Sequence, residues 1–281
     1  MNNDYFGVSA NRTSEAKLRF CSRFEVIPGK TPEEKLDLMK RWGFEGVELP
    51  GSAYSEPERY RKLCADFELI PTITGSVSAG GALVSEDKSK RQQGVDAMKK
   101  GLDAAAAIGQ HGVLYVPCFI NQTKLPNQEI RAILVDQLPP LAQYAKDAGL
   151  VIVFEPLNRG ESSFLNRVSD GAAICRDISV DSMKVMADFY HMAIEENDQM
   201  GAIVSAGKQY LDHVHLAGGV TSPRRSIPGQ NQSRYVEGFR GLKYIGYDRF
   251  CSFECSVQGD KMVEIPKAME FLRREWELAV V

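Results

Sequence analysis

Residues 151–159 read VIVFEPLNR: four apolar residues that favour strands come first, and a carboxylate, Glu155, and Pro156 follow directly. An apolar run of this kind is typical of a parallel strand that is buried on both faces. The charge therefore falls where the strand ends. In a barrel of parallel strands, residues at this C-terminal end carry the chemistry. The stretch predicts a buried strand that delivers Glu155 to a functional site.

Seven further apolar runs alternate with longer amphipathic stretches along the chain. Together with 151–155, the predicted strands are 19–27, 46–50, 69–75, 112–119, 183–188, 213–218 and 249–256. No hairpin signal separates them, and parallel strands need helical crossovers. Eight such units in 281 residues are typical of an α/β protein with a (β/α)8 TIM barrel, and we expect residues 1–281 to form one barrel domain. An open doubly wound sheet is the alternative, but the GxGxxG turn that would favour it is absent after the first strand.

Helix signals fill the intervals between the predicted strands. The stretch TPEEKLDLMKRWG begins with Thr31 as an N-cap and Pro32 at the first helical position, and it ends on Gly43. In NQEIRAILVDQLPPLAQYAKDAG, the pair Pro139 and Pro140 should kink or split the helix. The longest irregular segment, GGVTSPRRSIPGQNQSRYVEG, lies between the last two predicted strands and is typical of an active-site loop.

The composition is that of a globular protein, with 43% hydrophobic and 25% charged residues. The formal net charge of −3 offers no basic excess to a phosphate backbone, so we expect no binding of nucleic acid. No apolar run reaches the roughly 18 residues that span a bilayer, and the N-terminal stretch MNNDYFGVSANRTSEAK lacks the pattern of a secretory signal. The six cysteines form no CxxC pair. We therefore expect a cytoplasmic protein with reduced cysteines and no membrane association.

Four consecutive predicted strands each carry one potential metal ligand near the C-terminal end. These residues are Glu155, Asp188, His215 and Glu254. Side chains alternate between the two faces of a strand, so His213 and His215 share a face, as do Ser252 and Glu254. If that face lines the barrel, the three carboxylates and the imidazole meet at the barrel mouth.

Such a group of side chains favours a bound cation. Carboxylates a few ångströms apart raise one another's pKa, and burial adds to the cost of their charge. One divalent ion removes this cost. Three oxygen ligands and one nitrogen ligand favour Mn²⁺ or Mg²⁺, with Co²⁺ or Zn²⁺ as alternatives, and leave coordination positions for a substrate.

Taken singly, each of the four residues also has a structural interpretation. Glu155 can form a buried ion pair with Arg159, and Asp188 can cap the following helix. His215 can be a core histidine that is satisfied by neighbours, and Glu254 can be a charge at the edge of the sheet. Four such coincidences on successive strands are harder to explain than one shared site, because buried charges are seldom unpaired.

The stretches FEPLNRGE, ADFYHMAIEE, HVHLAG and FECS resemble the xylose-isomerase-like TIM-barrel superfamily, and most closely its ketose 3-epimerase and hydroxypyruvate isomerase branches. The N-terminal stretch PGKTPEEKLDLMKRWGFEGVEL is similar to the first βαβ unit of that family. The resemblance implies that the four residues ligate one metal ion and that Glu155 and Glu254 exchange protons with the substrate. It further implies substrate contacts for His191, Glu161 and Arg224, although AGGVTSPRR here replaces the usual acidic stretch after the histidine.

These residues predict a metal-dependent sugar isomerase or epimerase. A proton next to a metal-bound carbonyl would be removed to give an enediolate, with Glu155 and Glu254 as base and acid on opposite sides. We expect a small, unphosphorylated ketose or related keto-sugar as substrate, since no phosphate-binding glycine loop is present. A homodimer or homotetramer is compatible with the sequence.

Three other functions remain as alternatives. A lyase or dehydratase acting on a keto-sugar, an inosose or a keto-glycoside would use the same first step. An endonuclease that cuts at abasic sites with three zinc ions would need histidines on the third and fourth strands, where PTITGSVS and VPCF contain none. A barrel that only binds a sugar would not need the two glutamates.

Overall fold

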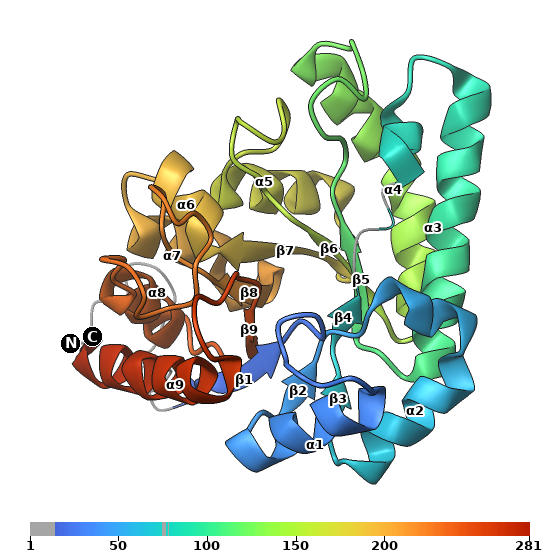
Figure 1. Ribbon diagram of the computed structural model, residues 1–281. Coiled ribbons are helices and arrows are strands. Elements are labelled where there is room, and N and C mark those ends of the chain that lie inside the picture. The colour runs from blue at the N-terminus through green and yellow to red at the C-terminus, as the bar shows by residue number, and fades with distance from the viewer. Residues whose placement is uncertain (1–14, 75–76, 78) are drawn as a thin grey trace.

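The computed structural model describes residues 15–74, 77 and 79–281 (Figure 1). Seven parallel strands form one sheet in the order β1-β9-β8-β7-β6-β5-β4, and β2 pairs with β3. The strands are β1 Arg19–Ser22, β2 Gly46–Val47, β3 Ile70–Pro71, β4 Ile73–Thr74, β5 Gly112–Tyr115, β6 Val151–Phe154, β7 Met183–Asp188, β8 Leu211–Leu216 and β9 Phe250–Phe253.

The two sheets join into a closed ring. β3 and β4 are the halves of the third predicted strand, and Thr72 between them donates its N–H to Val47 and accepts the N–H of His111, so it bonds to both neighbours. On the other side, the N–H of Glu48 donates to the carbonyl of Ser22, 3.0 Å away, which ties β2 to β1. The (β/α)8 barrel is therefore confirmed, with all eight predicted strands in place; residue 75 of the third lies outside the described residues.

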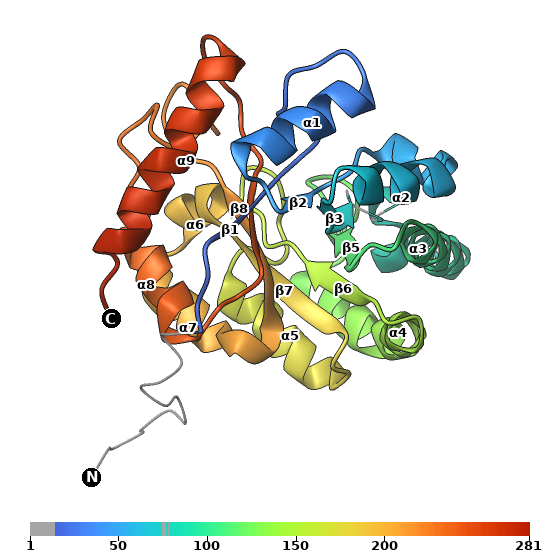
Figure 2. The same cartoon turned by 90° about the horizontal axis from the view of Figure 1, so that it is seen from below.

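Helices surround the ring of strands, as Figure 2 shows. They are α1 Pro32–Trp42, α2 Pro57–Asp66, α3 Lys88–Ile108, α4 Asn127–Asp147, α5 Val168–Ile178, α6 Phe189–Glu195, α7 Gln199–Tyr210, α8 Val236–Tyr244 and α9 Lys261–Leu278, with 3-10 turns η2 Gly51–Ser55 and η3 Ala79–Val84. The predicted caps of α1 are present: Thr31 Oγ1 accepts the N–H of Glu34, and Gly43 has a φ of 85°. α9, the last helix, packs against β1, where the guanidinium carbon of Arg273 lies 5.2 Å from the ring centroid of Phe20.

The prediction that Pro139 and Pro140 split a helix is wrong, because α4 runs through both without interruption. Each proline removes one backbone hydrogen bond from the helix. Pro140 is exposed and Pro139 is only half-buried, so water can reach the carbonyl groups that lose their partners.

The barrel interior is apolar on one side and polar on the other. Its apolar side is a separate cluster with one residue from each of β4 to β7, namely Ile73, Leu114, Val153 and Met186. On the side of β1, β2, β8 and β9, the buried side chains include Cys21, Glu48, His213 and Ser252. A barrel interior is a packed core in which side chains from alternate strands meet. Here the polar half supports the groups at the barrel mouth.

Other expectations concern the chain as a whole. All six cysteines are free, and five of them are buried. None of the helices in the described part of the chain is long and apolar enough to cross a membrane. The N-terminal stretch without a secretory pattern lies almost entirely outside the described residues, and the single domain over 1–281 stays a prediction.

A substitution at Gly112 tests the register of the barrel. A Cβ at Gly112 would lie 2.3 Å from the carbonyl oxygen of Val151, its partner on β6. We expect G112A to lower the free energy of unfolding by about 1–3 kcal/mol, because backbone rather than a flexible side chain must move. The control is G51A, since a Cβ at Gly51 meets nothing within 4 Å. Urea denaturation measures both, and equal stabilities would contradict this register.

Candidate functional site

Four side chains from four neighbouring strands meet at the C-terminal mouth of the barrel. Glu155 follows β6, Asp188 ends β7, His215 lies in β8 and Glu254 follows β9. One ligand atom of each lies within 4.8 Å of those of the other three. Asp188 pairs with His215, and His215 pairs with Ser252, two residues before Glu254. The candidate ligands of β7, β8 and β9 therefore lie at similar depth in the barrel. The structure thus brings together all four residues that the sequence proposed as metal ligands.

His215 is at the centre of this group. Its Nδ1 atom lies 2.7 Å from Oε2 of Glu254, 3.5 Å from Oε1 of Glu155 and 3.5 Å from Oδ2 of Asp188. The atom is fully buried, yet it makes no hydrogen bond of normal geometry to any described residue. A buried polar atom without a partner is costly, and here it faces three carboxylates. The donor set of three oxygens and one nitrogen fits a divalent cation.

The other nitrogen of His215 is held by a glutamate that follows β2, with β9 and β1 between that strand and β8. Oε1 of Glu48 lies 3.1 Å from Nε2 of His215 and 2.8 Å from Nε2 of His213. Burial opposes the ionisation of Glu48, but the charge of His215 and the hydrogen bond from His213 hold its pKa well below the ordinary value. An ionised carboxylate only accepts hydrogen bonds, so Nε2 of His215 carries a proton. Nδ1 is therefore the atom left to bind an ion, as in other carboxylate–histidine–metal arrangements.

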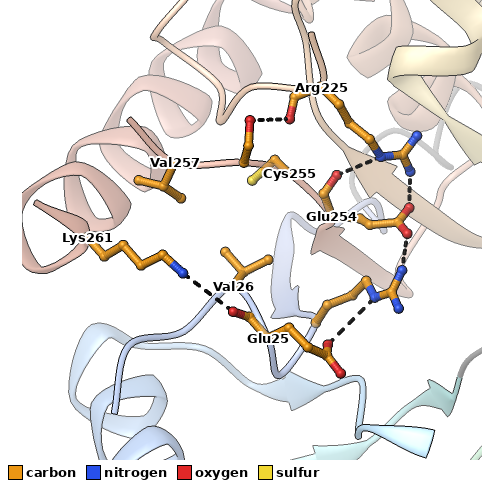
Figure 3. A pocket seen from close by; sticks show the side chains of 9 residues that line it. Glu25, Val26, Arg225, Glu254, Cys255, Val257 and Lys261 are labelled. Atoms are coloured by element: carbon orange, nitrogen blue, oxygen red, sulfur yellow. Dashed lines mark hydrogen bonds and ion pairs between the residues drawn. The ribbon is translucent and has the colours of Figure 1, made fainter. Parts of the chain in front are cut away.

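Positive charge balances the carboxylates in this structure. Arg225 Nη2 lies 2.6 Å from Oδ2 of Asp188 and also contacts Glu254 (Figure 3). Burial opposes ionisation of both acids, but the charge of Arg225 holds the pKa of Asp188, and that of His215 the pKa of Glu254, well below their ordinary values. Burial would lower the pKa of His215, but the charges of Glu254 and Glu48 raise it well above its ordinary value. In this structure the proton on His215 and the guanidinium of Arg225 supply the positive charge that a bound metal ion could supply instead.

The structural interpretations of Asp188 and Glu155 have different outcomes. Oδ1 of Asp188 does cap α6, because it accepts the N–H groups of Tyr190 and His191, while its Oδ2 faces the cluster. One residue therefore serves both purposes. Glu155 does not pair with Arg159, since the Arg159 side chain binds Glu195 at 2.8 Å instead. That pair fastens the loop after β6 to α6.

His191 presents an N–H group beside the cluster. The backbone N–H of Asn158 donates to its Nδ1 atom at 3.1 Å, so the imidazole proton must reside on Nε2. Nε2 lies 3.1 Å from Nη1 of Arg225. With its proton on Nε2, His191 can donate, as the guanidinium can, and an oxygen atom within hydrogen-bond reach of both nitrogens would accept from both. Glu161 is exposed and lies one step further away, where Oε1 accepts a hydrogen bond from the side chain of Asn158 at 2.8 Å.

The predicted active-site loop contributes Arg225, not its neighbour. Arg224 is exposed, whereas Arg225 points between Asp188 and Glu254. The backbone fixes this choice, because Gly218 and Ser226 form a bridge and the N–H of Ser256 donates to the carbonyl of Arg225 at 2.7 Å. Of these two arginines, therefore, only Arg225 reaches the cluster.

Sequence reasoning missed Glu48 and Asn158, and it assigned the substrate contact on the long loop to Arg224 instead of Arg225. A signal for Glu48 was present: in GVELP a carboxylate follows two strand residues and stands two positions before a proline, much as Glu155 directly precedes Pro156 in VIVFEP. Asn158 lies inside the EPLNR motif, but nothing local indicates that it orients His191. The remaining histidine, His111, precedes β5 and bonds to Asp212 at 2.7 Å, at the opposite end of the barrel. It cannot supply the additional ligand of a three-zinc site.

Fold and site together define a TIM barrel with a candidate metal centre at the C-terminal ends of its strands. Over residues 36–275 the sequence matches the family described as xylose isomerase-like TIM barrel, and the chain belongs to this family. The resemblance indicated by the sequence motifs is thereby confirmed.

The relatives of this chain include several sugar epimerases. The 3-dehydro-D-guloside 4-epimerase of Escherichia coli (strain K12) is 24% identical over 237 residues, which are 81% of this chain and 88% of the relative. The D-psicose 3-epimerase of Agrobacterium fabrum is 29% identical over 222 residues, which are 75% of each chain. The solved structure of an L-ribulose 3-epimerase superposes with a TM-score of 0.81 at 24% identity, covering 94% of this chain and 96% of that one.

Removal of the Glu48 charge tests whether Glu48 positions His215 for an ion. We expect E48Q to weaken Mn²⁺ binding by about 10–100-fold, because a neutral amide accepts more weakly than a carboxylate and can also donate, so it no longer fixes the tautomer of the imidazole. Titration against a fluorescent chelator measures the affinity without any turnover. The control is E45Q, since Glu45 is exposed and pairs with Arg19 away from the site. Equal affinities in E48Q and the wild type would contradict this role.

Metal binding should also release a proton. The raised pKa of His215 keeps its imidazole charged in the metal-free protein, including above the ordinary histidine pKa of about 6.5. An ion that takes Nδ1 displaces that proton, so apparent affinity should fall as the pH falls. Calorimetry in two buffers of different ionisation enthalpy should find about one proton released per ion near pH 8. Release of none at that pH would show that the imidazole is already neutral.

Proposed function

We propose that this chain is a divalent-metal-dependent epimerase or isomerase of an unphosphorylated ketose or related keto-sugar. The observation that carries the proposal is the buried Nδ1 of His215, which makes no hydrogen bond of normal geometry and faces the carboxylates of Glu155, Asp188 and Glu254. The sugar epimerases among its relatives support the same class of reaction. Mn²⁺ or Mg²⁺ suits the donor set, with Co²⁺ or Zn²⁺ as alternatives.

A bound cation would polarise the substrate carbonyl and stabilise the charge that develops when the neighbouring proton is lost. The two glutamates then exchange protons with carbon. Glu155 and Glu254 follow β6 and β9, and their oxygens approach His215 Nδ1 to 3.5 and 2.7 Å respectively. We assign one as the base that removes the proton and the other as the acid that returns it on the opposite face.

Neighbouring groups hold the substrate oxygens. Nε2 of His191 and Nη1 of Arg225 lie 3.1 Å apart, close enough for both to donate to one substrate oxygen. An oxygen bound there gains two hydrogen bonds, one of them charge-assisted. Glu161 is placed to act through Asn158, which links it to His191. These contacts would orient the sugar so that the carbon that reacts lies between the two glutamates.

Deuterium exchange tests the reaction directly. Mn²⁺-loaded protein is incubated in D₂O with a panel of ketoses and keto-glycosides, and recovered sugars are analysed by mass spectrometry and NMR. We expect deuterium at the carbon next to the carbonyl, with an epimer or isomer formed. Loss of water or of the aglycone would assign a lyase instead. Absence of exchange with every compound would favour a barrel that only binds sugars.

The two glutamates can be tested separately. We expect E155Q and E254Q at saturating Mn²⁺ each to lower turnover by about 10²–10⁴-fold, the contribution typical of general acid–base catalysis. E237Q is the matched control, because Glu237 is exposed on α8 and pairs with Arg240. Wild-type turnover in either site variant would remove that residue from the acid–base pair.

A further inference from the structure

A cavity of about 490 Å³ opens beside Glu254, between β1, the loop after β8 and the start of α9 (Figure 3). Glu155, Asp188 and His215 are not among its lining residues, so it extends away from the candidate metal centre. Val26 and Val257 form part of its wall. This volume lies within the range of small-molecule sites and leaves room for substrate atoms beyond the carbons that react.

Three cationic side chains line this cavity from three separate segments. Arg23 follows β1, Arg225 lies on the loop after β8, and Lys261 is the first residue of α9. Figure 3 shows Arg225 and Lys261 on different sides of the space. Among the described residues, the Lys261 ammonium donates a hydrogen bond only to the backbone carbonyl of Glu25, at 3.4 Å, and no carboxylate forms an ion pair with it.

The acids of the cavity wall are fewer than the cations. They are Glu25, which is 3.8 Å from Arg23, and Glu254, which contacts both Arg23 and Arg225. In the function proposed above, Glu254 serves the metal ion and the substrate. Both arginines then lose a carboxylate that they share in this structure. Arg225 keeps its contact with Asp188, but Arg23 and Lys261 would then face Glu25 alone. Unpaired charge in a partly buried cavity is unfavourable.

We propose that this cavity binds an anionic group carried by the sugar substrate, with Arg23 and Lys261 as its principal partners. The inference rests on the proposed function and revises one part of it: the substrate is a keto-sugar with an anionic group, a carboxylate or a phosphate, away from the carbonyl that reacts. The planar guanidinium of Arg23 can pair with a carboxylate through two parallel hydrogen bonds. The ammonium of Lys261, at the start of α9, adds a second positive charge. A bound anion supplies the negative charge that Glu254 no longer provides to Arg23 and Arg225.

Binding without turnover gives the first test. Calorimetry with Mn²⁺-loaded protein compares D-glucitol, D-gluconate and D-glucitol 6-phosphate, which share a carbon chain and lack a ketone. We expect at least one anion to bind about tenfold or more tightly than D-glucitol, and the better one identifies carboxylate or phosphate. In K261Q and R23Q the preference should shrink to about threefold or less. K267Q is the matched control, since Lys267 lies on the same helix, exposed, and pairs with Glu264.

Exchange in D₂O gives the second test and separates the two proposals. D-Fructose, D-fructuronate and D-fructose 6-phosphate differ only at C6. Faster exchange with an anionic member, lost in K261Q while D-fructose is unaffected, supports the cavity. Equal exchange with all three, or an anion preference that survives in both K261Q and R23Q, overturns it and leaves the epimerase proposal intact. If no ketose exchanges, the proposed function fails, and the calorimetry alone decides whether the cavity binds anions.

Discussion

Repulsion among three carboxylates around one buried imidazole is the constraint on which the rest of the site depends. Glu155 and Asp188 are buried, and Glu254 is partly buried. Their ligand atoms lie within 4.8 Å of one another, and water has little access. Ionised acids this close together are stable only when positive charge lies among them. Here Arg225 and a charged His215 provide it. The same electrostatics that would hold a divalent ion therefore explains why a guanidinium reaches into the barrel mouth.

The fold meets this constraint through the unequal halves of the barrel interior. Apolar residues from β4 to β7 fill one half, and this leaves β1, β2, β8 and β9 to line a polar half. Glu48 lies in this polar half and can therefore accept hydrogen bonds from His213 and His215. The orientation of one candidate ligand is thus set by a strand that is not its neighbour. Closure of the ring through Thr72 and Glu48 contributes directly to the geometry of the site.

Local patterns in the sequence were sufficient for the strands and for the four converging residues. Alternation along a strand places His213 with His215, and parallel strands present their C-terminal ends on one side. Such local patterns do not reveal contacts between segments that are far apart in the sequence. The choice of Arg225 over Arg224 depends on a bond from Ser256, and the role of Glu48 depends on residues about 165 positions later. The tolerance of Pro139 depends on solvent access, which periodicity does not encode.

Glu254 couples the metal centre to the cavity beside it. Its Oε2 atom faces His215 and Arg225, while its Oε1 atom contacts Arg23 on the cavity side. An ion that engages this carboxylate would weaken its hold on both arginines and make the cavity more positive. An anion in the cavity would, in turn, occupy the arginines and release the carboxylate for the ion. Linkage requires these two effects to be equal in free energy. A substrate that carries its own charge would therefore strengthen the site that activates it.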